Sequence, residues 1–196
     1  MEGFTDQQLV QMTLDGELEA YSVLVQRYQK QIYSLTYRLS NNPEDARDFA
    51  QDAFIHIYKV LGKYDQNRSF FSWMYKVATN VCYNNLRKIK NKREVSLDKI
   101  IEFSPLVGLK ENQPEENFVR RETQALVRRA VTELPELYRV PMILRYMEDL
   151  TYRQIAEVMD LPLTTIETRL YRGRALLQKR LQAWGEGGPV NEVSGN

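Results

Sequence analysis

The stretch that decides the fold runs from Thr151 to Leu181 and reads TYRQIAEVMDLPLTTIETRLYRGRALLQKRL. Thr151 and Gln154 form a capping-box pair, which predicts the start of a short amphipathic helix. The residues Asp160-Leu161-Pro162 predict a turn, and apolar residues at helical spacing from Ile166 predict a second, longer helix. Asp160 stands where glycine is usual, and aspartate tolerates left-handed geometry better than most residues. This spacing is typical of a helix-turn-helix.

The longer helix is expected to carry a polar outer face and a cationic flank. Residues 169–180 include five basic residues and no acidic one. A helix in the major groove needs short polar groups and arginine for base edges, with cations beside them for phosphates. The pattern predicts binding to duplex DNA, and the alternative is a solvated basic face on an ordinary helical hairpin. The outer face comprises Thr164, Glu167, Thr168, Tyr171 and Arg172, with Arg169, Arg174, Lys179 and Arg180 beside or beyond it.

Upstream of this motif, apolar residues recur at spacings of three and four rather than two, so we expect an all-α protein. Helices are predicted from Thr5 to about Gly16, over 17–39, from Pro43 to Leu61 and from Ser69 to about residue 90. Residues 91–117 lose this periodicity and contain three proline or glycine residues, which indicates a flexible linker. The sequence therefore predicts two small helical domains, a bundle over 1–90 and a helix-turn-helix domain over 118–184, with a disordered tail over 185–196.

Composition excludes several classes of protein. The chain has 196 residues, 27 basic and 26 acidic, and a single cysteine and histidine. Cys82 and His56 are too few for a disulfide or a conventional zinc site, so no metal and no cofactor is expected. No apolar run is long enough to cross a bilayer and the first residues do not resemble a signal peptide, which favours a cytoplasmic protein that does not insert into membranes.

The helix from about Ser69 to residue 90 carries aromatic, amide and cationic residues on its expected outer face. Such a face suits unstacked single-stranded bases, because rings stack on bases and cations follow the backbone. A mixture of core and rim positions explains Trp73 and Tyr83 equally well. The face comprises Trp73, Lys76, Asn80, Tyr83, Asn84 and Arg87, and it leads into a basic run that ends at Arg93.

These residues together resemble bacterial sigma factors of the extracytoplasmic-function group, in the sigma-70 family. The resemblance rests on AYSVLVQRYQKQIYSLTYRL, PEDARDFAQDAFIHIYKVLGKYD, RSFFSWMYKVATNVCYNNLRK and LPELYRVPMILRYMEDLTYRQIAEVMDLPLTTIETRLYRGRALLQKRL. It implies a subunit without a catalytic site that binds core RNA polymerase, recognises the minus-ten and minus-thirty-five promoter elements and helps to melt the duplex. It also implies an anti-sigma partner, which is membrane-bound in many relatives, and no homo-oligomer.

The resemblance assigns three sets of residues. Polymerase docking falls on the acidic face of the helix after Pro43, although acids in a first helical turn are also favoured by the helix dipole. Contacts to the minus-ten element fall on the loop from Tyr64 and on the following helix. The sets are Asp45, Asp48, Gln51 and Asp52 for polymerase; Tyr64, Asn67, Arg68, Trp73, Lys76, Asn80, Asn84 and Arg87 for minus-ten; and Thr164, Glu167, Thr168, Arg169, Tyr171, Arg172 and Arg174 for minus-thirty-five, with Arg169 and Arg174 assigned to phosphates.

Two residues depart from the family pattern. Glu167 stands where many relatives carry lysine or arginine, so it either accepts from cytosine or repels phosphate, and the preferred promoter sequence stays open. Pro141 lies inside a predicted helix, where it removes a backbone donor, and we expect a kink there.

The linker sets a geometric constraint. The two promoter elements are about 25 base pairs apart, which is roughly 85 Å of duplex. Residues 91–117 reach about 90–97 Å when extended, but a free coil of this length averages only about 30 Å. We therefore expect polymerase to hold the linker stretched, whereas without polymerase the two domains can collapse on one another.

Two other classes of function compete with the sigma factor. A stand-alone helix-turn-helix repressor explains the duplex-reading motif but has no need of a single-strand face. A phosphodiester-cleaving enzyme has little support, because His56 is isolated and no acidic pair has a metal-ligand context. The charge distribution favours the sigma factor. Residues 84–93 and 169–180 hold ten of the 27 basic residues, and the rest of the chain has 17 basic and 26 acidic residues. The cations are therefore concentrated on the two predicted DNA-binding faces.

Overall fold

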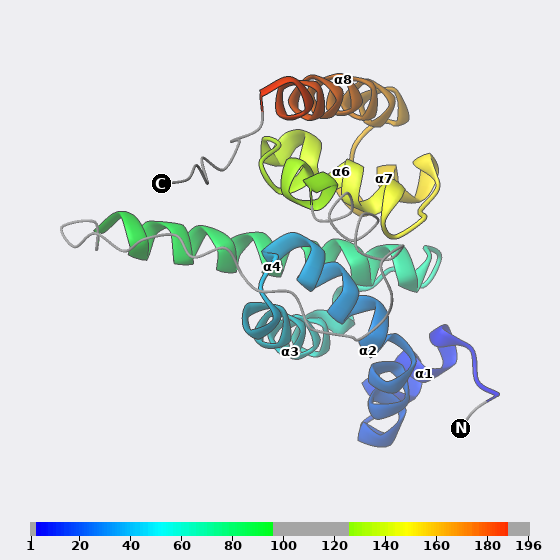
Figure 1. Ribbon diagram of the computed structural model, residues 1–196. Coiled ribbons are helices and arrows are strands. Elements are labelled where there is room, and N and C mark those ends of the chain that lie inside the picture. Colours follow the sequence, from blue (N-terminus) through cyan, green and yellow to red (C-terminus); the bar gives the residue numbers. More distant parts are fainter. Residues whose placement is uncertain (1–2, 96–125, 188–196) are drawn as a thin grey trace, which may run out of the picture.

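The computed structural model describes residues 3–95 and 126–187, and every regular element within these ranges is helical. The expected all-α class is therefore confirmed. In Figure 1 the long helix α4 (Phe70–Val95) lies between two groups of helices, with α1 (Asp6–Leu14) and α3 (Pro43–Val60) below it and α6 (Glu136–Tyr146), α7 (Tyr152–Met159) and α8 (Leu163–Gly187) above it. The helix α2 (Leu18–Ser40) packs against both α3 and α4.

The N-terminal group begins its helices where side chains can satisfy free backbone N–H groups. The backbone N–H of Gln8 donates to Thr5 Oγ1 at 3.3 Å, and Gln8 Oε1 accepts from the Thr5 N–H at 2.8 Å, which completes the predicted capping box. The Asn42 side chain accepts from the backbone of Glu44 and Asp45 at the start of α3. These caps confirm the predicted helix starts, because each satisfies donors that the helix itself leaves free.

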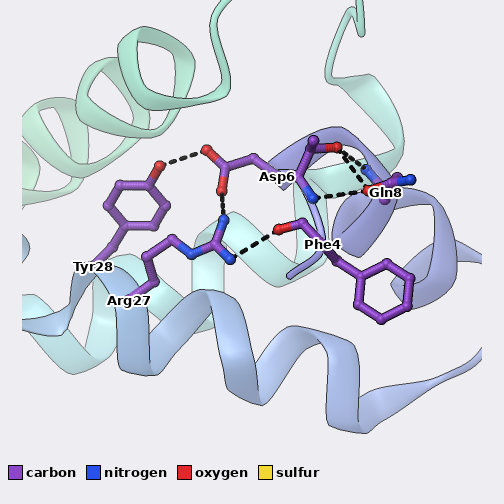
Figure 2. Close-up of polar contacts among 6 residues, drawn as sticks. Phe4, Asp6, Gln8, Arg27 and Tyr28 are labelled. Carbon is purple, nitrogen blue, oxygen red and sulfur yellow. Dashed lines mark hydrogen bonds and ion pairs between the residues drawn. The ribbon is translucent and has the colours of Figure 1, made fainter. Parts of the chain in front are cut away.

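The first helix docks on the second through one carboxylate. Asp6, in the first turn of α1, accepts from the Arg27 guanidinium and from the Tyr28 hydroxyl of α2 (Figure 2). Arg27 also donates to the Phe4 carbonyl at 3.0 Å. Leu9 and Val10 are fully buried beneath these contacts, so α1 closes one end of the bundle.

The hydrophobic core of this group follows the predicted helical periodicity. Because α2, α3 and α4 each present one apolar stripe, their buried residues meet in one cluster. The buried residues on these stripes are Leu24, Ile32, Leu35, Leu39, Ala46, Phe49, Ala50, Ala53, Ile57, Leu61, Phe70, Met74, Ala78 and Cys82.

The C-terminal group contains the predicted helix-turn-helix. The backbone N–H of Gln154 donates to Thr151 Oγ1 at 3.3 Å at the start of α7, and Asp160 ends that helix with φ of 54°, in the left-handed region. Ile166 and Leu170 are fully buried on the inner face of α8. Pro141 is buried within α6, and the helix continues through it to Tyr146.

The helix ends lie beyond the predicted domain boundaries. The helix α4 extends to Val95, so the first residues of the expected linker 91–117 are helical. Residues 126–132 are helical and belong to the domain predicted over 118–184. The helix α8 extends to Gly187, next to Gly188 and Pro189, so residues 185–187 of the expected tail are helical. The rest of the linker, residues 118–125 and the rest of the tail lie outside the described residues.

The two groups of helices are packed together. Their buried residues form one continuous hydrophobic cluster, and α4 contacts α7 while α2 contacts α6. This arrangement is the collapse that the sequence allows for a chain without polymerase.

Candidate nucleic-acid interface

The helix α8 presents the polar face that the sequence predicts for duplex DNA. Thr164, Glu167, Thr168, Tyr171, Arg172 and Arg174 are all exposed, and Tyr171 retains 69% of its accessible surface. The face is fixed because Ile166 and Leu170 anchor the opposite side of the helix in the core. Short polar groups, an aromatic ring and arginines therefore project together from one rigid helix, as base and phosphate contacts require.

A glycine that the sequence analysis did not single out sets the position of α8. Gly173 is buried where α8 crosses α6, and a Cβ atom there would lie 3.0 Å from Met142 Cγ and 3.1 Å from Met142 Sδ. The absence of a side chain lets the two helices approach closely. Only the crossing partner reveals this role, because a glycine within a helical pattern has no local signal for close packing.

The loop before α4 is held in shape by its own side chains. The Tyr64 hydroxyl donates to the Arg68 carbonyl at 2.6 Å, and the Asn67 N–H donates to Asp65 Oδ1 at 3.0 Å. Burial raises the pKa of Tyr64, so its hydroxyl keeps the proton that it donates. Tyr64 is buried, whereas Asn67 and Arg68 are exposed, so the loop offers an amide and a guanidinium on a fixed backbone.

The predicted minus-ten residues of α4 lie along one side of the helix. Asn80, Asn84 and Arg87 are exposed, and Lys76 is half-buried. Trp73 is half-buried, and its ring lies 5.2 Å from the ring of Tyr64, centroid to centroid. The structure therefore brings the loop and the helix face together around this aromatic pair.

The prediction that Tyr83 lies on the outer face of α4 is wrong. Tyr83 is buried, with 8% of its surface accessible, because the C-terminal group covers this part of α4. A cleft of about 420 Å³ separates the two groups here. Its lining comprises Lys76, Thr79, Asn80 and Tyr83 of α4, Glu136, Leu137 and Val140 of α6, Val158 and Met159 of α7, and Arg169 of α8.

Arg169 consequently has different surroundings from the rest of its face. It is half-buried and lines the cleft against α4, whereas Arg172 and Arg174 are exposed. In this arrangement Arg169 lies at the cleft between the two groups, whereas the sequence predicted a phosphate contact for it.

The helix α3 carries the predicted acidic face. Asp48, Gln51 and Asp52 are exposed and Asp45 is half-buried, and Asp52 accepts from Asn85 of α4 at 2.8 Å. These acids lie along the outer side of α3, where a partner of opposite charge can reach them.

Next to this face lies an apolar hollow that sequence reasoning missed. It has a volume of about 1090 Å³ between α2 and α3, and Gln51 lies on its edge. Four exposed apolar residues line it, namely Leu18, Tyr33, Ile55 and Tyr58. The available signal was that these residues lie off the core stripes of their helices, since exposed apolar clusters mark interaction sites.

The described residues offer no group of three or more His, Cys, Asp or Glu side chains that suits a metal ion. His56 is exposed on α3. Cys82 is buried, and burial raises the pKa of its thiol to about 12, so it stays protonated. Among residues 3–95 and 126–187, no helix has the length and apolar character needed to span a membrane.

Known families match both groups of helices. Residues 24–93 match the family described as sigma-70 region 2, and residues 124–177 match the family described as sigma-70, region 4. ECF RNA polymerase sigma factor SigW of Bacillus subtilis is 32% identical over 174 residues, which cover 85% of this chain and 91% of the relative. RNA polymerase sigma-H factor of Pseudomonas aeruginosa is 35% identical over 182 residues, which cover 90% of this chain and 94% of the relative.

Two solved structures share the fold. CnrH in complex with the cytosolic domain of CnrY has a TM-score of 0.65 at 20% identity and covers 91% of this chain and 97% of its own. The sigma factor RpoE in complex with the anti-sigma factor NepR from Bartonella quintana has a TM-score of 0.64 at 18% identity. The match covers 83% of this chain and 96% of the RpoE chain. At these identities the likeness shows the arrangement of helices alone.

Proposed function

This chain belongs to the extracytoplasmic-function sigma factors of the sigma-70 family, which direct promoter-specific transcription initiation by RNA polymerase, and on that premise we propose how its residues divide the task. The helix α8 reads the minus-thirty-five element as duplex, and the Tyr64 loop with α4 binds the minus-ten element as single strand. The observation that carries this division is the contrast between two faces: polar groups and arginine on an exposed helix of a helix-turn-helix, and rings, amides and cations around Trp73.

For the duplex, we assign base contacts to the exposed centre of α8. Arg172 donates in a bidentate manner to guanine, and Thr164, Thr168 and Tyr171 contact neighbouring base edges or methyl groups. Glu167 is exposed and accepts from cytosine N4. Arg174 contacts phosphate, and Arg169 joins it once the two groups of helices separate.

For the single strand, the Tyr64 loop supplies a rigid platform. Asn67 and Arg68 are exposed on a loop whose backbone is fixed by the Tyr64 hydroxyl. Trp73 presents the exposed part of its ring for stacking, Asn80 and Asn84 donate and accept at base edges, and Lys76 and Arg87 neutralise the backbone.

Polymerase docking is proposed for the outer side of α3. Asp45, Asp48, Gln51 and Asp52 attract a basic surface of core polymerase. The adjoining hollow with Leu18, Tyr33, Ile55 and Tyr58 adds apolar area, so the interface combines a charged rim with an apolar centre.

An anti-sigma factor is the second protein partner that we propose. Of the two structural neighbours, RpoE was solved with the anti-sigma factor NepR, and CnrH was solved with the cytosolic domain of CnrY. The chain acts in the cytoplasm, where the chromosome and polymerase are, and it contributes no catalytic residue of its own. Membrane attachment of the inhibitor is a further part of this proposal.

Run-off transcription tests the function directly. Purified chain is added to core RNA polymerase with genomic promoter fragments, and transcripts are sequenced from their first nucleotide. Initiation at a defined set of promoters is expected only when the chain is present. If no fragment supports initiation while the chain alone still binds specific duplexes, the repressor function is correct instead.

A further inference from the structure

The helix α1 precedes the stretch that matches sigma-70 region 2, which begins at residue 24. It nevertheless contacts the short helix η1 (Leu61–Lys63), which leads directly into the Tyr64 loop. A Cβ atom at Gly62 of η1 would lie 3.9 Å from Leu14 Cδ2, at the end of α1. The C-terminal end of α1 therefore lies against the entry to the loop that we assign to the minus-ten strand.

One hydrogen bond joins α1 to the loop itself. Gln66 Nε2 donates to Gln11 Oε1 at 3.0 Å, and Gln11 Nε2 donates to Asp15 Oδ1 at 2.9 Å. Asp15, the C-cap of α1, thereby orients the Gln11 amide so that its oxygen faces the loop. Gln11 and Gln66 are both exposed, as are Asn67 and Arg68, so this contact lies next to the loop residues proposed to meet DNA.

The position of Gln66 affects the shape of the whole loop. The backbone N–H and the side-chain amide of Asn67 both donate to Asp65 Oδ1 at 3.0 Å, and the Arg68 N–H donates to the Asp65 carbonyl at 3.0 Å. Because Gln66 lies between Asp65 and Asn67 in the chain, a rotation of its backbone would separate these partners. A contact that fixes Gln66 therefore also fixes Asn67 and Arg68.

The other end of α1 is held by side chains that reach the aromatic residues beneath the loop. Asp6 accepts from the Arg27 guanidinium and from the Tyr28 hydroxyl, both on α2 (Figure 2). The Tyr28 ring lies 5.9 Å from the Phe70 ring, and the Phe70 ring lies 5.4 Å from the Tyr64 ring, centroid to centroid. Both ends of α1 are consequently connected to the loop, one by a hydrogen bond and the other through packed rings.

We propose that Gln11 is a positioning residue for minus-ten recognition, because it holds Gln66 and thereby fixes the Tyr64 loop in the shape that presents Asn67 and Arg68 to one base. This inference rests on the proposed role of the loop in binding the minus-ten strand. Gln11 acts through Gln66 and not by contacting DNA. Base contacts specify sequence and need fixed geometry, whereas phosphate contacts supply affinity, so loss of Gln11 is expected to reduce base discrimination more than overall binding.

Gln11 can be changed without disturbing the core. Its side chain is exposed, whereas the fully buried residues of α1 are Leu9 and Val10. Gln7 lies one turn earlier on the same helix and is also exposed. Gln7→Ala is therefore the matched control for Gln11→Ala, because both substitutions change the helix propensity of α1 by the same amount.

Hydrogen exchange on the free chain, measured by nuclear magnetic resonance, tests the contact directly. Gln11→Ala is expected to accelerate exchange of the Asn67 and Arg68 amides by about threefold or more relative to Gln7→Ala, because the loop opens more often. Gln66→Ala should give a similar acceleration, and the double variant should add little to it, since either substitution removes the same hydrogen bond. Unchanged urea unfolding in all variants excludes a general loss of stability.

Base discrimination is measured with the polymerase holoenzyme. The probe is a promoter fragment identified by run-off transcription, with one strand unpaired across the minus-ten element and each base of that element replaced in turn. Gln11→Ala is expected to reduce the preference for the original base at one position by about threefold or more, and to leave affinity for the poorest sequence within about twofold. Gln7→Ala should leave the preference unchanged at every position.

The outcomes separate this inference from the proposed function. If Asn67→Ala or Arg68→Ala changes the base preference but Gln11→Ala does not, the loop binds the strand without help from α1 and the inference is overturned. Equal weakening by Gln11→Ala at every position overturns it as well, because the role of Gln11 is then purely structural. If neither Asn67→Ala nor Arg68→Ala alters the preference, or if no promoter supports initiation, the proposed function is wrong and the inference fails with it.

Discussion

Glu148 and Arg38 form an ion pair between the two groups of helices, with Glu148 Oε1 3.1 Å from Arg38 Nε. The carboxyl side chain of Glu148 retains only 6% of its accessible surface, and Arg38 also donates to the neighbouring Met147 carbonyl. Tyr75 completes the surroundings from α4. Because the carboxylate is withdrawn from water, burial raises its pKa more than Arg38, Ser34 and Tyr75 lower it, and Asp149 raises it further.

This relationship predicts a pH dependence of docking. A raised pKa in the docked state means that the contribution of Glu148 to docking is complete below the ordinary carboxyl pKa. That contribution is lost as the pH rises through the raised value. The Asp160 pKa is lowered, so its contribution is lost only below the ordinary aspartate range. Between neutral pH and the ordinary carboxyl pKa, acidification is therefore expected to increase the fraction of chains in which the two groups of helices are packed together. The measurement is the distance between spin labels on cysteines introduced at the exposed positions Gln26 of α2 and Gln178 of α8.

The variant Glu148→Gln is the control for this effect. Glutamine has similar size and no titrating group, so the pH dependence in that range is expected to disappear. A slope that survives in Glu148→Gln shows that another group is responsible. Loss of far-ultraviolet circular dichroism on acidification would instead report unfolding, and the comparison is restricted to pH values at which the signal is constant.

Arg172 is expected to read a base. Arg172→Ala in the polymerase holoenzyme should cost about 1–3 kcal/mol of binding free energy at promoters with the preferred minus-thirty-five element, and little at promoters with an altered element. Arg174→Ala, which removes a phosphate contact, should weaken both by similar factors. Equal weakening by Arg172→Ala on all sequences would make it a phosphate contact as well. Binding is measured with duplexes that differ only in that element.

The acidic face of α3 is expected to bind polymerase. Asp48→Lys with Asp52→Lys should weaken binding to core polymerase by roughly tenfold or more, because like charges would then face one another. The isolated chain should unfold at nearly the same temperature, since both side chains are exposed. Asp15→Lys with Glu17→Lys, in the turn between α1 and α2, makes the same change of charge away from this face. If both pairs of substitutions leave affinity unchanged, the docking assignment is incorrect.

Gly173 is expected to limit the size of side chain at the crossing of α6 and α8. Gly173→Leu should destabilise the chain by about 1–3 kcal/mol, because the added atoms overlap Met142 and Tyr138. Gly173→Ala should be within about 1 kcal/mol of the parent, since Met142 can shift and alanine favours the helix. Urea unfolding measures both. Similar stability of the leucine variant would show that the crossing is not close-packed in solution.

Local sequence patterns determined where the helices begin and which side of each helix is buried. The capping pairs at Thr5 and Thr151 and the helix start at Pro43 depend only on residues within the first turn of each helix. The left-handed backbone of Asp160 likewise follows from the turn between two amphipathic segments. These predictions succeeded because capping and helical periodicity involve neighbours three or four residues apart.

Only the tertiary structure decided the roles of Tyr83, Gly173 and Glu148. Each depends on a partner from a helix that is distant in sequence: Tyr83 is covered by the C-terminal group, Gly173 meets Met142, and Glu148 binds Arg38 and Tyr75. The sequence alone indicated two DNA-binding faces, and it allowed the two groups to collapse together. It did not show which residues would meet, because docking is determined by the shapes and charges of assembled surfaces rather than by local pattern.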